Sequence, residues 1–239
     1  MQTSSPLPTT APIANRLIEK LPPLEHAHFM AHCEQVELQV GHVLCESETP
    51  FQHVYFPMSG VISMVKVLNG HQSIETEQIG NEGMLGVTVL LGVDVAPERS
   101  VVQASGTALQ MPPRELLEIL KHSPVAARYL KHYLYVMILQ LTQTATCFRF
   151  HDVAARLARA LLTVHDRAHS DHFHLTHQVL ADMLGVQRGG VTIAAGHLQR
   201  ANIIHYTRGH ISILDRKALE AESCDCYGMV MDGYARLLP

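Results

Sequence analysis

The chain has 239 residues, of which 47% are hydrophobic and 17% are charged, so it can form one large domain or two ordinary ones with proper cores. This composition excludes a small disulfide-stapled scaffold and a disordered chain. With 18 basic against 22 acidic residues, the formal net charge is −4, which gives no overall attraction to nucleic acid or to an anionic membrane. Such a partner has to be inferred from local charge.

Location and redox state follow from simple features of the chain. The longest uncharged stretch, residues 133–148, contains several polar residues and falls short of the roughly 20 apolar residues that cross a bilayer. Residues 1–20 lack the basic and apolar regions of an export signal, so we expect a flexible tail there. The 5 cysteines show no CxxC spacing, which favours reduced thiols. We therefore expect a cytoplasmic protein with no membrane partner.

The first half of the chain has the pattern of a β-domain. Short apolar segments, broken by turn residues, occupy 36–40, 53–56, 60–65, 73–79 and 99–103. Asn69-Gly70 marks a tight turn between two of them. This alternation predicts short antiparallel strands that form a barrel or jelly roll. A short helix over 114–120 then closes a domain that we assign to residues 21–123.

A long helix is expected over residues 124–150, opened by Pro124. Its apolar residues recur at alternating spacings of four and three, as in the seam of a coiled coil: Leu130, Leu134, Met137, Leu141, Thr144 and Phe148. The helix is also apolar on its other side, so it should bury one face on the β-domain and pair through the seam in a homodimer. A core helix buried within one chain would give the same pattern. A hinge is expected at 150–152.

Residues 151–239 contain the spacing of a helix-turn-helix. Thr176 is the expected N-cap of the first helix. Ala181, Gly185 and Val191 then provide a small residue at the helix contact, a glycine for the turn and an aliphatic residue that locks the second helix. The segment 198–215 reads as a helix end and two strands joined at Arg208-Gly209, which is a wing. An amphipathic helical hairpin could also meet the spacing.

Local charge supports contact with DNA. Residues 173–217 hold five basic and two acidic side chains, a charge of +3 that the acidic remainder of the chain conceals. Together, a β-domain, a long helix and the segment LTHQVLADMLGVQRGGVTIAAGHLQRANIIHYTRGHISILDRKALE resemble the CRP/FNR family of bacterial transcription regulators over roughly residues 20–220. The resemblance implies an α+β fold with an N-terminal jelly roll of the cyclic-nucleotide-binding type, a dimerisation helix and a C-terminal winged helix-turn-helix.

The same resemblance implies a homodimer on a palindromic operator in double-stranded DNA, RNA polymerase as a partner, and no catalytic residues. Gln187, Arg188 and Gly189 match the start of the family's recognition helix, where a Ser-Arg-Glu-like triplet is usual. Arg188 is the candidate guanine reader and Gln187 the candidate adenine reader. Because Gly189 and Ile193 replace the family's acidic and basic side chains, we expect a different operator.

Candidate phosphate contacts accompany these base readers. They are His177, Gln178, Thr192, His197, Arg200 and Arg208, each of which could instead be a solvated surface group. Gly189-Gly190 in the first turn of the recognition helix costs roughly 1 kcal/mol per glycine relative to alanine. Either the backbone approaches DNA closely there, or the helix becomes ordered only on binding.

The resemblance also suggests an effector site. In nucleotide-binding members a Glu holds the ribose and an Arg-Ser pair holds the cyclic phosphate. The candidate effector residues here are Gly86, Val87, Arg99, Ser100 and Thr142. Val87 stands at the ribose-binding Glu position, which argues against ordinary cyclic AMP. Another ligand, a nucleotide in a different pose and no ligand all stay open, and Arg99 could simply pair with Glu98 or Glu82.

Two other function classes remain. A cupin-like metal enzyme would need two close histidines and a carboxylate on the barrel strands, where His42, His53 and His71 are scattered singly. The second class is a DNA-binding regulator that has no effector and is controlled by its abundance. We expect no metal site: Cys224 and Cys226 stand one residue apart without other evident ligands. The histidines of 165–177 read as a polar linker.

Overall fold

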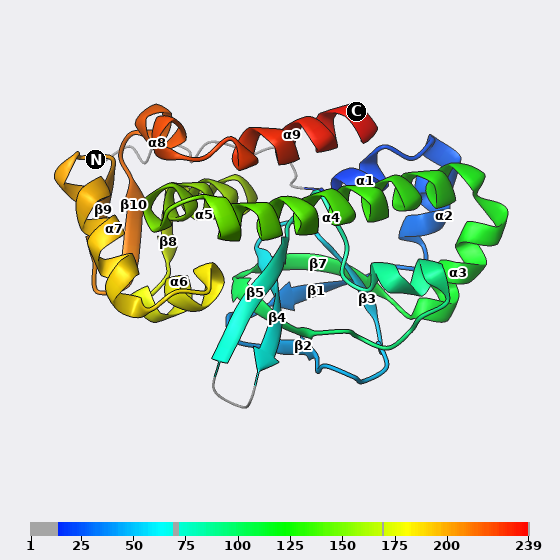
Figure 1. Ribbon diagram of the computed structural model, residues 1–239. Helices are drawn as coiled ribbons and strands as arrows, with labels where there is room; N and C mark the ends of the chain where they lie inside the picture. Colours follow the sequence, from blue (N-terminus) through cyan, green and yellow to red (C-terminus); the bar gives the residue numbers. More distant parts are fainter. Residues whose placement is uncertain (1–13, 69–71, 169, 239) are drawn as a thin grey trace, which may run out of the picture.

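The computed structural model describes residues 14–68, 72–168 and 170–238. Two antiparallel sheets form the N-terminal half (Figure 1). One sheet has the order β1-β7-β3, with β1 at Glu34–Leu38, β7 at Gly106–Met111 and β3 at Val54–Pro57. The other has the order β2-β6-β4-β5, with β2 at Val43–Cys45, β6 at Arg99–Ala104, β4 at Val61–Leu68 and β5 at Gln72–Ile79. The predicted β-domain is confirmed. The predicted turn Asn69-Gly70 and His71 lie outside the described residues.

Both sheets contribute side chains to one hydrophobic core. Phe56 and Val102 from opposite sheets are fully buried in it, because alternate residues of each strand point inward. Two short helices extend this core, α1 at Arg16–Glu19 and α2 at Pro23–Met30. The ring of Phe29 on α2 meets the ring of Phe56 edge to face, with centroids 5.2 Å apart. A short 3-10 helix, η1 at Val87–Leu91, packs its buried residues into the same core.

The N-terminal segment differs from the expected tail over 1–20. From residue 14 onward the chain is folded against the β-domain, and Leu17 and Ile18 are 2% and 3% exposed. Asn15 caps α1 by accepting a hydrogen bond from the Leu17 amide. Its side-chain amide donates to the carbonyls of Pro57 and Gly83 at 2.9 and 2.8 Å. These partners are remote in sequence, so the residue order alone does not reveal them.

Helix α4 spans Pro124–Phe150, the range in which the long helix is expected, and follows α3 at Pro113–His122. Ser123 caps α4 by accepting from the Ala126 amide, and Pro124 stands in its first turn. Tyr133, 1% exposed, fixes the helix to the β-domain core. The helix therefore uses one face for its own chain, as its apolar pattern predicts.

The predicted seam divides between two environments. Leu130 is 3% exposed and belongs to the β-domain core, while Leu134 and Met137 are half-buried against it. The large apolar residues that α4 leaves exposed are Tyr135, Ile138 and Leu141, at 48%, 53% and 44%, and Phe150 at its end, at 73%. The outward apolar stripe shares Leu141 with the predicted seam but is rotated from it at Tyr135 and Ile138, because the β-domain takes up the seam's first residues.

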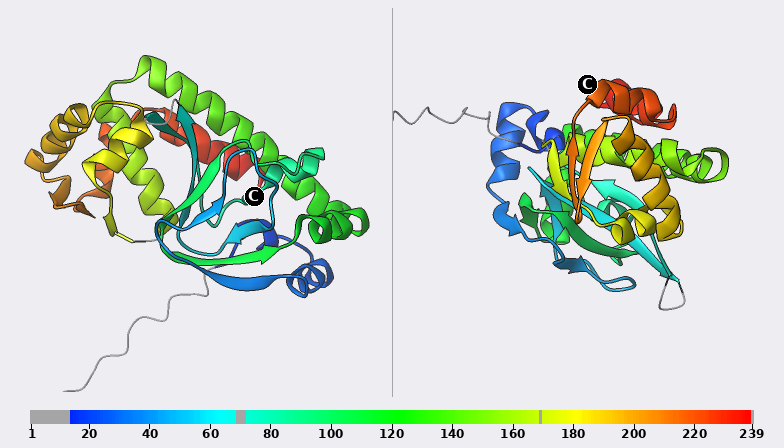
Figure 2. Two further views of the ribbon diagram at one scale, coloured as in Figure 1. Left: turned by 90° about the horizontal axis from the view of Figure 1, so that it is seen from below. Right: turned by 90° about the vertical axis from the view of Figure 1, so that its left-hand side faces the viewer.

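The C-terminal half is a second domain with its own core. Its helices are α5 at Val153–Ala168, α6 at His177–Leu184, α7 at Arg188–Arg200, α8 at Arg216–Glu222 and α9 at Cys226–Leu237. Its sheet has the order β8-β10-β9, with β8 at His172–His174, β10 at His210–Ile213 and β9 at Ile204–Thr207. Helix α9 leaves this domain and lies along α4 (Figures 1 and 2). The predicted α+β class is confirmed.

The segment 165–177, whose histidines read as a polar linker, is mostly structured over its described residues. Helix α5 begins after its cap Asp152, which accepts from the Ala155 amide at 2.9 Å, and continues to Ala168. It extends this far because Val164 and Arg167 are buried on its inner side.

Within the described residues, no helix combines the length and hydrophobicity that crossing a membrane requires.

The two domains meet at a buried ion pair. Arg167 of α5 donates from Nε to Oε1 of Glu82 at 2.6 Å and from Nη1 to Oε1 of Gln78 at 3.3 Å. The Arg167 and Glu82 side chains are only 9% and 11% exposed. Burial alone lowers the pKa of Arg167, but the Glu82 carboxylate outweighs it and the net shift is upward. A guanidinium of the C-terminal half is therefore held charged inside the β-domain surface.

Glu77 on β5 lies beside this pair without a partner of its own. It is 7% exposed and its Oε1 accepts no hydrogen bond. Burial raises the pKa of Glu77 to about 8, against a lowering effect of Arg167 and further raising effects of Glu82 and Glu98. Burial likewise raises the pKa of Glu75 to about 7. Both carboxyls are thus neutral in the folded protein under mildly acidic conditions.

From the raised pKa values of Glu75 and Glu77 we predict that the protein loses stability as the pH rises. A pKa raised in the folded state means that the folded protein binds more protons than the unfolded chain between the ordinary carboxyl value and about pH 8. The free energy of unfolding should therefore fall from about pH 5 to pH 8, at about 1.4 kcal/mol per unit of pKa difference. Urea unfolding at several pH values measures this slope.

The variant Glu77→Gln should flatten that slope, because the amide keeps the shape of the side chain and cannot ionise. Glu37→Gln on the exposed part of β1 is the matched control and should leave the slope unchanged. An equal slope in wild type and Glu77→Gln would show that Glu77 is ionised in the folded protein.

Candidate DNA-binding surface

Helices α6 and α7 form a helix-turn-helix. Thr176 caps α6 by accepting a hydrogen bond from the Val179 amide at 3.2 Å, as predicted. Gly185 ends α6 in the left-handed conformation with φ 59°, which glycine adopts without strain. Arg156 of α5 donates to the Leu184 carbonyl at the same end. The turn is therefore fixed from inside the domain as well as by its own backbone.

The two helices are locked by small and aliphatic side chains. Ala181 and Val191, at 1% and 0% exposed, lie where α6 and α7 meet, so the residue types predicted for this contact occupy it. Leu157 and Leu161 of α5 are fully buried beneath them. Since α7 is held on one side by this core, only its opposite side is free.

The free side of α7 carries most of the predicted DNA-contacting residues. Gln187 is the N-cap of α7, without a side-chain capping bond, and Arg188 is its first residue. Spacings of three and four place the exposed residues along one stripe: Arg188, Gly189, Thr192, Ile193, His197 and Arg200. Ile193 is 75% exposed, an unusual position for a large aliphatic side chain. Figure 2 (right) looks onto this end of the molecule.

The two predicted phosphate contacts on α6 are engaged within the domain. His177 stacks on Tyr206 of the wing, with centroids 4.3 Å apart, and its Nδ1 lies 3.0 Å from the Thr192 hydroxyl. Burial, and secondarily Arg188, lowers the pKa of His177, which favours its neutral form. Gln178 donates to Asp182 at 3.0 Å. His177 therefore joins α6, α7 and the wing, and Gln178 remains exposed on α6.

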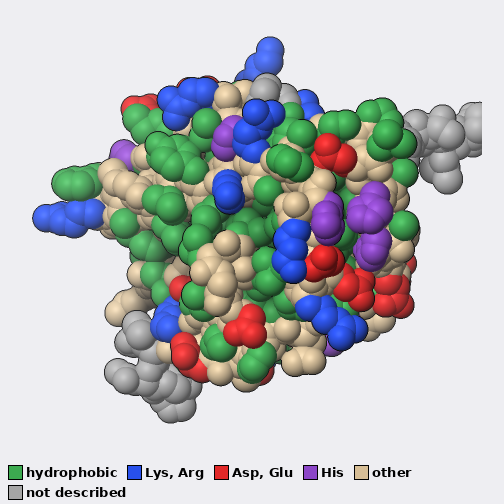
Figure 3. Space-filling model, turned by 90° about the vertical axis from the view of Figure 1, so that its right-hand side faces the viewer, with side chains coloured by type: hydrophobic (Ala, Val, Ile, Leu, Met, Phe, Trp, Pro, Cys, Tyr) green, Lys and Arg blue, Asp and Glu red, His purple; other side chains and the backbone are tan. Residues whose placement is uncertain are grey.

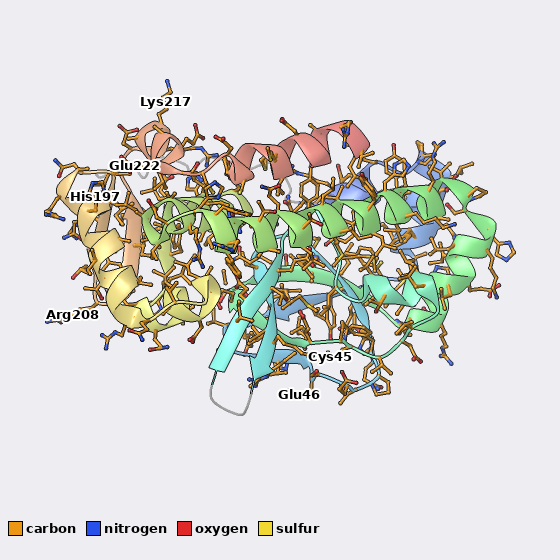
Figure 4. The ribbon with its side chains drawn as sticks, in the orientation of Figure 1. Cys45, Glu46, His197, Arg208, Lys217 and Glu222 are labelled. Atoms are coloured by element: carbon orange, nitrogen blue, oxygen red, sulfur yellow. The ribbon has the colours of Figure 1, made fainter. Side chains whose placement is uncertain are left out.

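The wing ends in a tight turn between β9 and β10. Arg208 and Gly209 have φ values of 48° and 86°, the left-handed conformations that a two-residue hairpin turn of this twist needs. A Cβ on Gly209 would lie 2.8 Å from His174 Nε2, so only glycine fits against β8. Arg208 is exposed at the tip, at the same end of the molecule as His197 (Figure 4). The opposite end carries acidic and basic side chains intermixed (Figure 3).

The five candidate effector residues have different environments. Val87 and Ser100 are 3% and 0% exposed, Gly86 is buried, and Thr142 is exposed on α4, donating to the Ile138 carbonyl. Arg99 is 42% exposed and pairs with Glu46 at 3.4 Å, rather than with Glu98 or Glu82. None of the five lines the cavity formed by residues of β5, α4, α5 and α9.

That cavity, of about 380 Å³, lies between the two domains. Its lining includes the ionisable side chains of the domain boundary, among them Glu75, Glu77 and Arg167. Residues of α9 close another side, including Tyr234, whose hydroxyl accepts from the Gln140 amide at 2.6 Å. The chain thus forms an interdomain cavity, lined by apolar as well as ionisable side chains, that the sequence analysis did not identify.

Four further side chains converge at the hinge: Cys147, His151, Cys224 and Cys226. Sequence analysis considered only the last two as a pair. The signal that could have found the others is the four-residue spacing of Cys147 and His151, which puts both on one side of a helix end. The described histidines of 165–177 do not join this group: His165 contacts Asp171, and His172 contacts Ser212.

Family models match both halves of the chain. A cyclic nucleotide-binding domain matches residues 35–123, and a Crp-like helix-turn-helix domain matches residues 155–222. The matches coincide with the β-domain and with the domain that carries α6, α7 and the wing. No curated protein matches the sequence.

Solved structures with the same architecture are numerous. The c-di-GMP-responsive global regulator CLP of Xanthomonas campestris is 17% identical, with a TM-score of 0.65 over 80% of this chain and 99% of that chain. FixK2 from Bradyrhizobium japonicum is 15% identical, with a TM-score of 0.69 over 80% and 98%. A CRP-family transcriptional regulator from Thermus thermophilus is 17% identical, with a TM-score of 0.67 over 79% and 96%. At these identities the likeness concerns the fold.

Proposed function

Because the chain belongs to the CRP/FNR family of transcription regulators, we propose that it acts as a homodimer whose two α7 helices read a palindromic operator in double-stranded DNA. The observation that carries this proposal is the free side of α7, with Arg188 exposed in its first turn. An α-helix presented in this way fits the major groove, where its N-terminal residues reach base edges. RNA polymerase is the proposed protein partner, and the cytoplasm is the proposed location of the protein. No catalytic step is part of this function.

Base recognition is assigned to the first turns of α7. Arg188 can donate two hydrogen bonds to guanine O6 and N7, and Gln187 can pair with adenine. Ile193 provides an apolar surface that suits the methyl group of thymine. Gly189 and Ile193 replace the acidic and basic readers usual in the family, so the proposed operator differs from the usual one.

The two adjacent glycines in the first turn of α7, Gly189 and Gly190, support a close approach of its backbone to DNA. Both lie inside the helix, and a Cβ on Gly189 would meet nothing within 4 Å. Internal packing therefore gives no reason for glycine, although each one costs roughly 1 kcal/mol of helix stability relative to alanine. A partner outside the chain supplies the reason, because a bare backbone can lie nearer to a base or phosphate than any side chain allows.

Phosphate contacts fix the domain on the duplex. Thr192, His197 and Arg200 flank the base-reading turn, and Arg208 on the wing reaches the neighbouring backbone. On α6, Gln178 is the residue proposed to contact a phosphate. His177 is assigned a positioning role, because it already stacks on Tyr206 and contacts Thr192.

The dimer is proposed to form through the exposed stripe of α4. Tyr135, Ile138 and Leu141 give an apolar strip of roughly two turns on the outer side of the helix, next to the half-buried Leu134 and Met137. Pairing two copies of this face would give the dimer the two-fold symmetry of a palindromic operator, whose half-sites lie about one helical turn apart.

Control by a small effector in the β-domain is the remaining part of the proposal. Its support is the match to a cyclic nucleotide-binding domain and the half-exposed guanidinium of Arg99 beside Ser100. Val87 takes the place of the ribose-binding Glu, and a ribose hydroxyl buried without its acceptor would cost about 1–3 kcal/mol. The effector, if one binds, is therefore not held as cyclic AMP usually is.

Arg188→Ala should reduce discrimination between the operator and a version in which the contacted guanine is replaced. One bidentate contact to guanine contributes about 1–3 kcal/mol to discrimination, so the preference should fall roughly 5- to 150-fold. Arg208→Ala should instead weaken binding to both sequences alike and reduce the salt slope by about one. Binding-site selection, followed by fluorescence anisotropy at several salt concentrations, measures both effects. Arg114→Ala on α3 is the control; an unaltered preference in Arg188→Ala would refute its assignment.

Gly189→Ala should stabilise the free protein by up to about 1 kcal/mol and at the same time weaken operator binding. The first effect comes from helix propensity and the second from a methyl group between α7 and DNA. Gly228→Ala in α9, also with open space around it, is the matched control and should change stability only. Tighter operator binding by Gly189→Ala would show that the glycines serve helix ordering instead.

Ile138→Lys should convert the dimer into monomers, because pairing would bury an ammonium group without a partner. Operator affinity should then fall on the order of 100-fold, since the second half-site no longer adds to the first. Leu24→Lys, on a side chain that is 87% exposed on α2, is the control and should stay dimeric. Sedimentation velocity distinguishes the two states. A wild-type monomer at operator-binding concentrations would contradict the proposal.

A further inference from the structure

Three thiols and one imidazole meet at the hinge between the domains. Cys147 lies in the last turn of α4, and His151 follows as the C-cap residue of that helix. Cys224 lies in the link between α8 and α9, and Cys226 is the first residue of α9. The three sulfur atoms and a ring nitrogen of His151 all lie within 4.8 Å of one another, and the three cysteines are buried.

The distances match the edges of a tetrahedron around one metal ion. Zinc binds cysteine sulfur at about 2.3 Å and histidine nitrogen at about 2.0–2.1 Å, so tetrahedral ligands lie about 3.8 Å apart for two sulfurs and about 3.5 Å for sulfur and nitrogen. The Sγ atoms of Cys147 and Cys224 are 3.6 Å apart. Cys226 Sγ lies 3.4 Å from His151 Nδ1. The side chains thus need little movement to surround an ion.

The donor set points to zinc among the metals of a cell. Three thiolates and an imidazole are poor ligands for magnesium or calcium, which take oxygen. A cluster of several irons requires ligands spread over different iron atoms, whereas these four atoms surround a single point. Gln143 donates from Nε2 to Cys226 Sγ at 2.9 Å, the kind of outer hydrogen bond that orients a metal-bound thiolate.

A disulfide explains less of this arrangement. A bond between Cys147 and Cys224 would use two of the four groups and would leave Cys226 and His151 placed around it without a role. Four buried or half-buried donors, with no position left open, are instead typical of a structural zinc site.

We propose that Cys147, His151, Cys224 and Cys226 bind a zinc ion that fastens the start of α9 to the end of α4. Helix α9 is already attached along α4, and we call it the strap. Gln140 of α4 donates to Tyr234 of α9, and His132 Nδ1 lies 3.0 Å from the Leu237 carbonyl. The ion would add a further attachment at the start of this strap. The strap crosses the hinge at 150–152, so it would restrict how the DNA-binding domain moves relative to α4. This inference rests on the hinge geometry and not on the function proposed above.

The first experiment measures metal in the full chain, purified under reducing conditions without chelator. Mass spectrometry of the metal content should find about one zinc per chain, as a closed four-ligand site requires. Cys224→Ser and Cys147→Ser should lose it, while Cys33→Ser, far from the hinge in the β-domain, should retain it. Circular dichroism establishes which variants are folded.

The second experiment uses the wild-type chain and so does not depend on the folding of a variant. Zinc is exchanged for cobalt, which in a tetrahedral thiolate site gives visible d–d absorption and thiolate-to-cobalt charge transfer. His151→Asn should alter the cobalt spectrum, and Cys33→Ser should not. Loss of the metal to a chelator should lower the midpoint of thermal unfolding.

Four results would overturn the proposal, of which the first three concern the wild type. These are a folded, metal-free wild type that takes up no cobalt; iron with inorganic sulfide in place of zinc; and a Cys147–Cys224 disulfide under reducing conditions, detected by thiol counting and peptide mapping. Zinc that persists in Cys224→Ser and Cys147→Ser alike would place it elsewhere and would overturn the proposal as well.

Discussion

The placement of the two domains depends on the ion pair between Arg167 and Glu82. Arg167 belongs to the domain that carries the helix-turn-helix, yet its guanidinium lies inside the surface of the β-domain and is 2.6 Å from the carboxylate. Removing one partner of such a pair costs about 3–5 kcal/mol, because the other charge stays buried. The ion pair therefore stabilises this arrangement of the domains only when both charged side chains are present.

That constraint explains the surroundings of the pair. Glu77 and Glu75 lie near the same guanidinium, but Glu82 already neutralises it, so burial dominates the pKa of both and each favours its neutral form. The interdomain cavity and the turn between α6 and α7 are fixed by the same region, since β5 contacts α6 directly. An effector that rotates the DNA-binding domain has to supply the free energy of separating Arg167 from Glu82.

The sequence predicts those parts of the fold that local chemistry determines. Thr176 caps its helix through a contact three residues away, and Gly185 turns the chain through its own φ. Signals of this kind are readable in residue order. Where a partner is remote the prediction differs from the structure: Asn15 orders the expected tail through Pro57 and Gly83, and Arg99 pairs with Glu46. The periodicity likewise predicts the apolar faces of α4, but it does not predict which of these faces packs against the β-domain.

The hinge cluster lay beyond prediction for the same reason, because Cys147 and Cys224 are 77 positions apart in the sequence. It depends on α9 folding back along α4, and no local pattern dictates that return. The strap and the ion pair hold the DNA-binding domain at different points: Arg167 attaches α5 to the β-domain, whereas α9 attaches the end of the chain to α4. The contact of β5 with α6 is a third attachment, so α7 cannot be displaced without breaking at least one of them. A zinc ion at the end of α4 would strengthen the attachment that α9 makes.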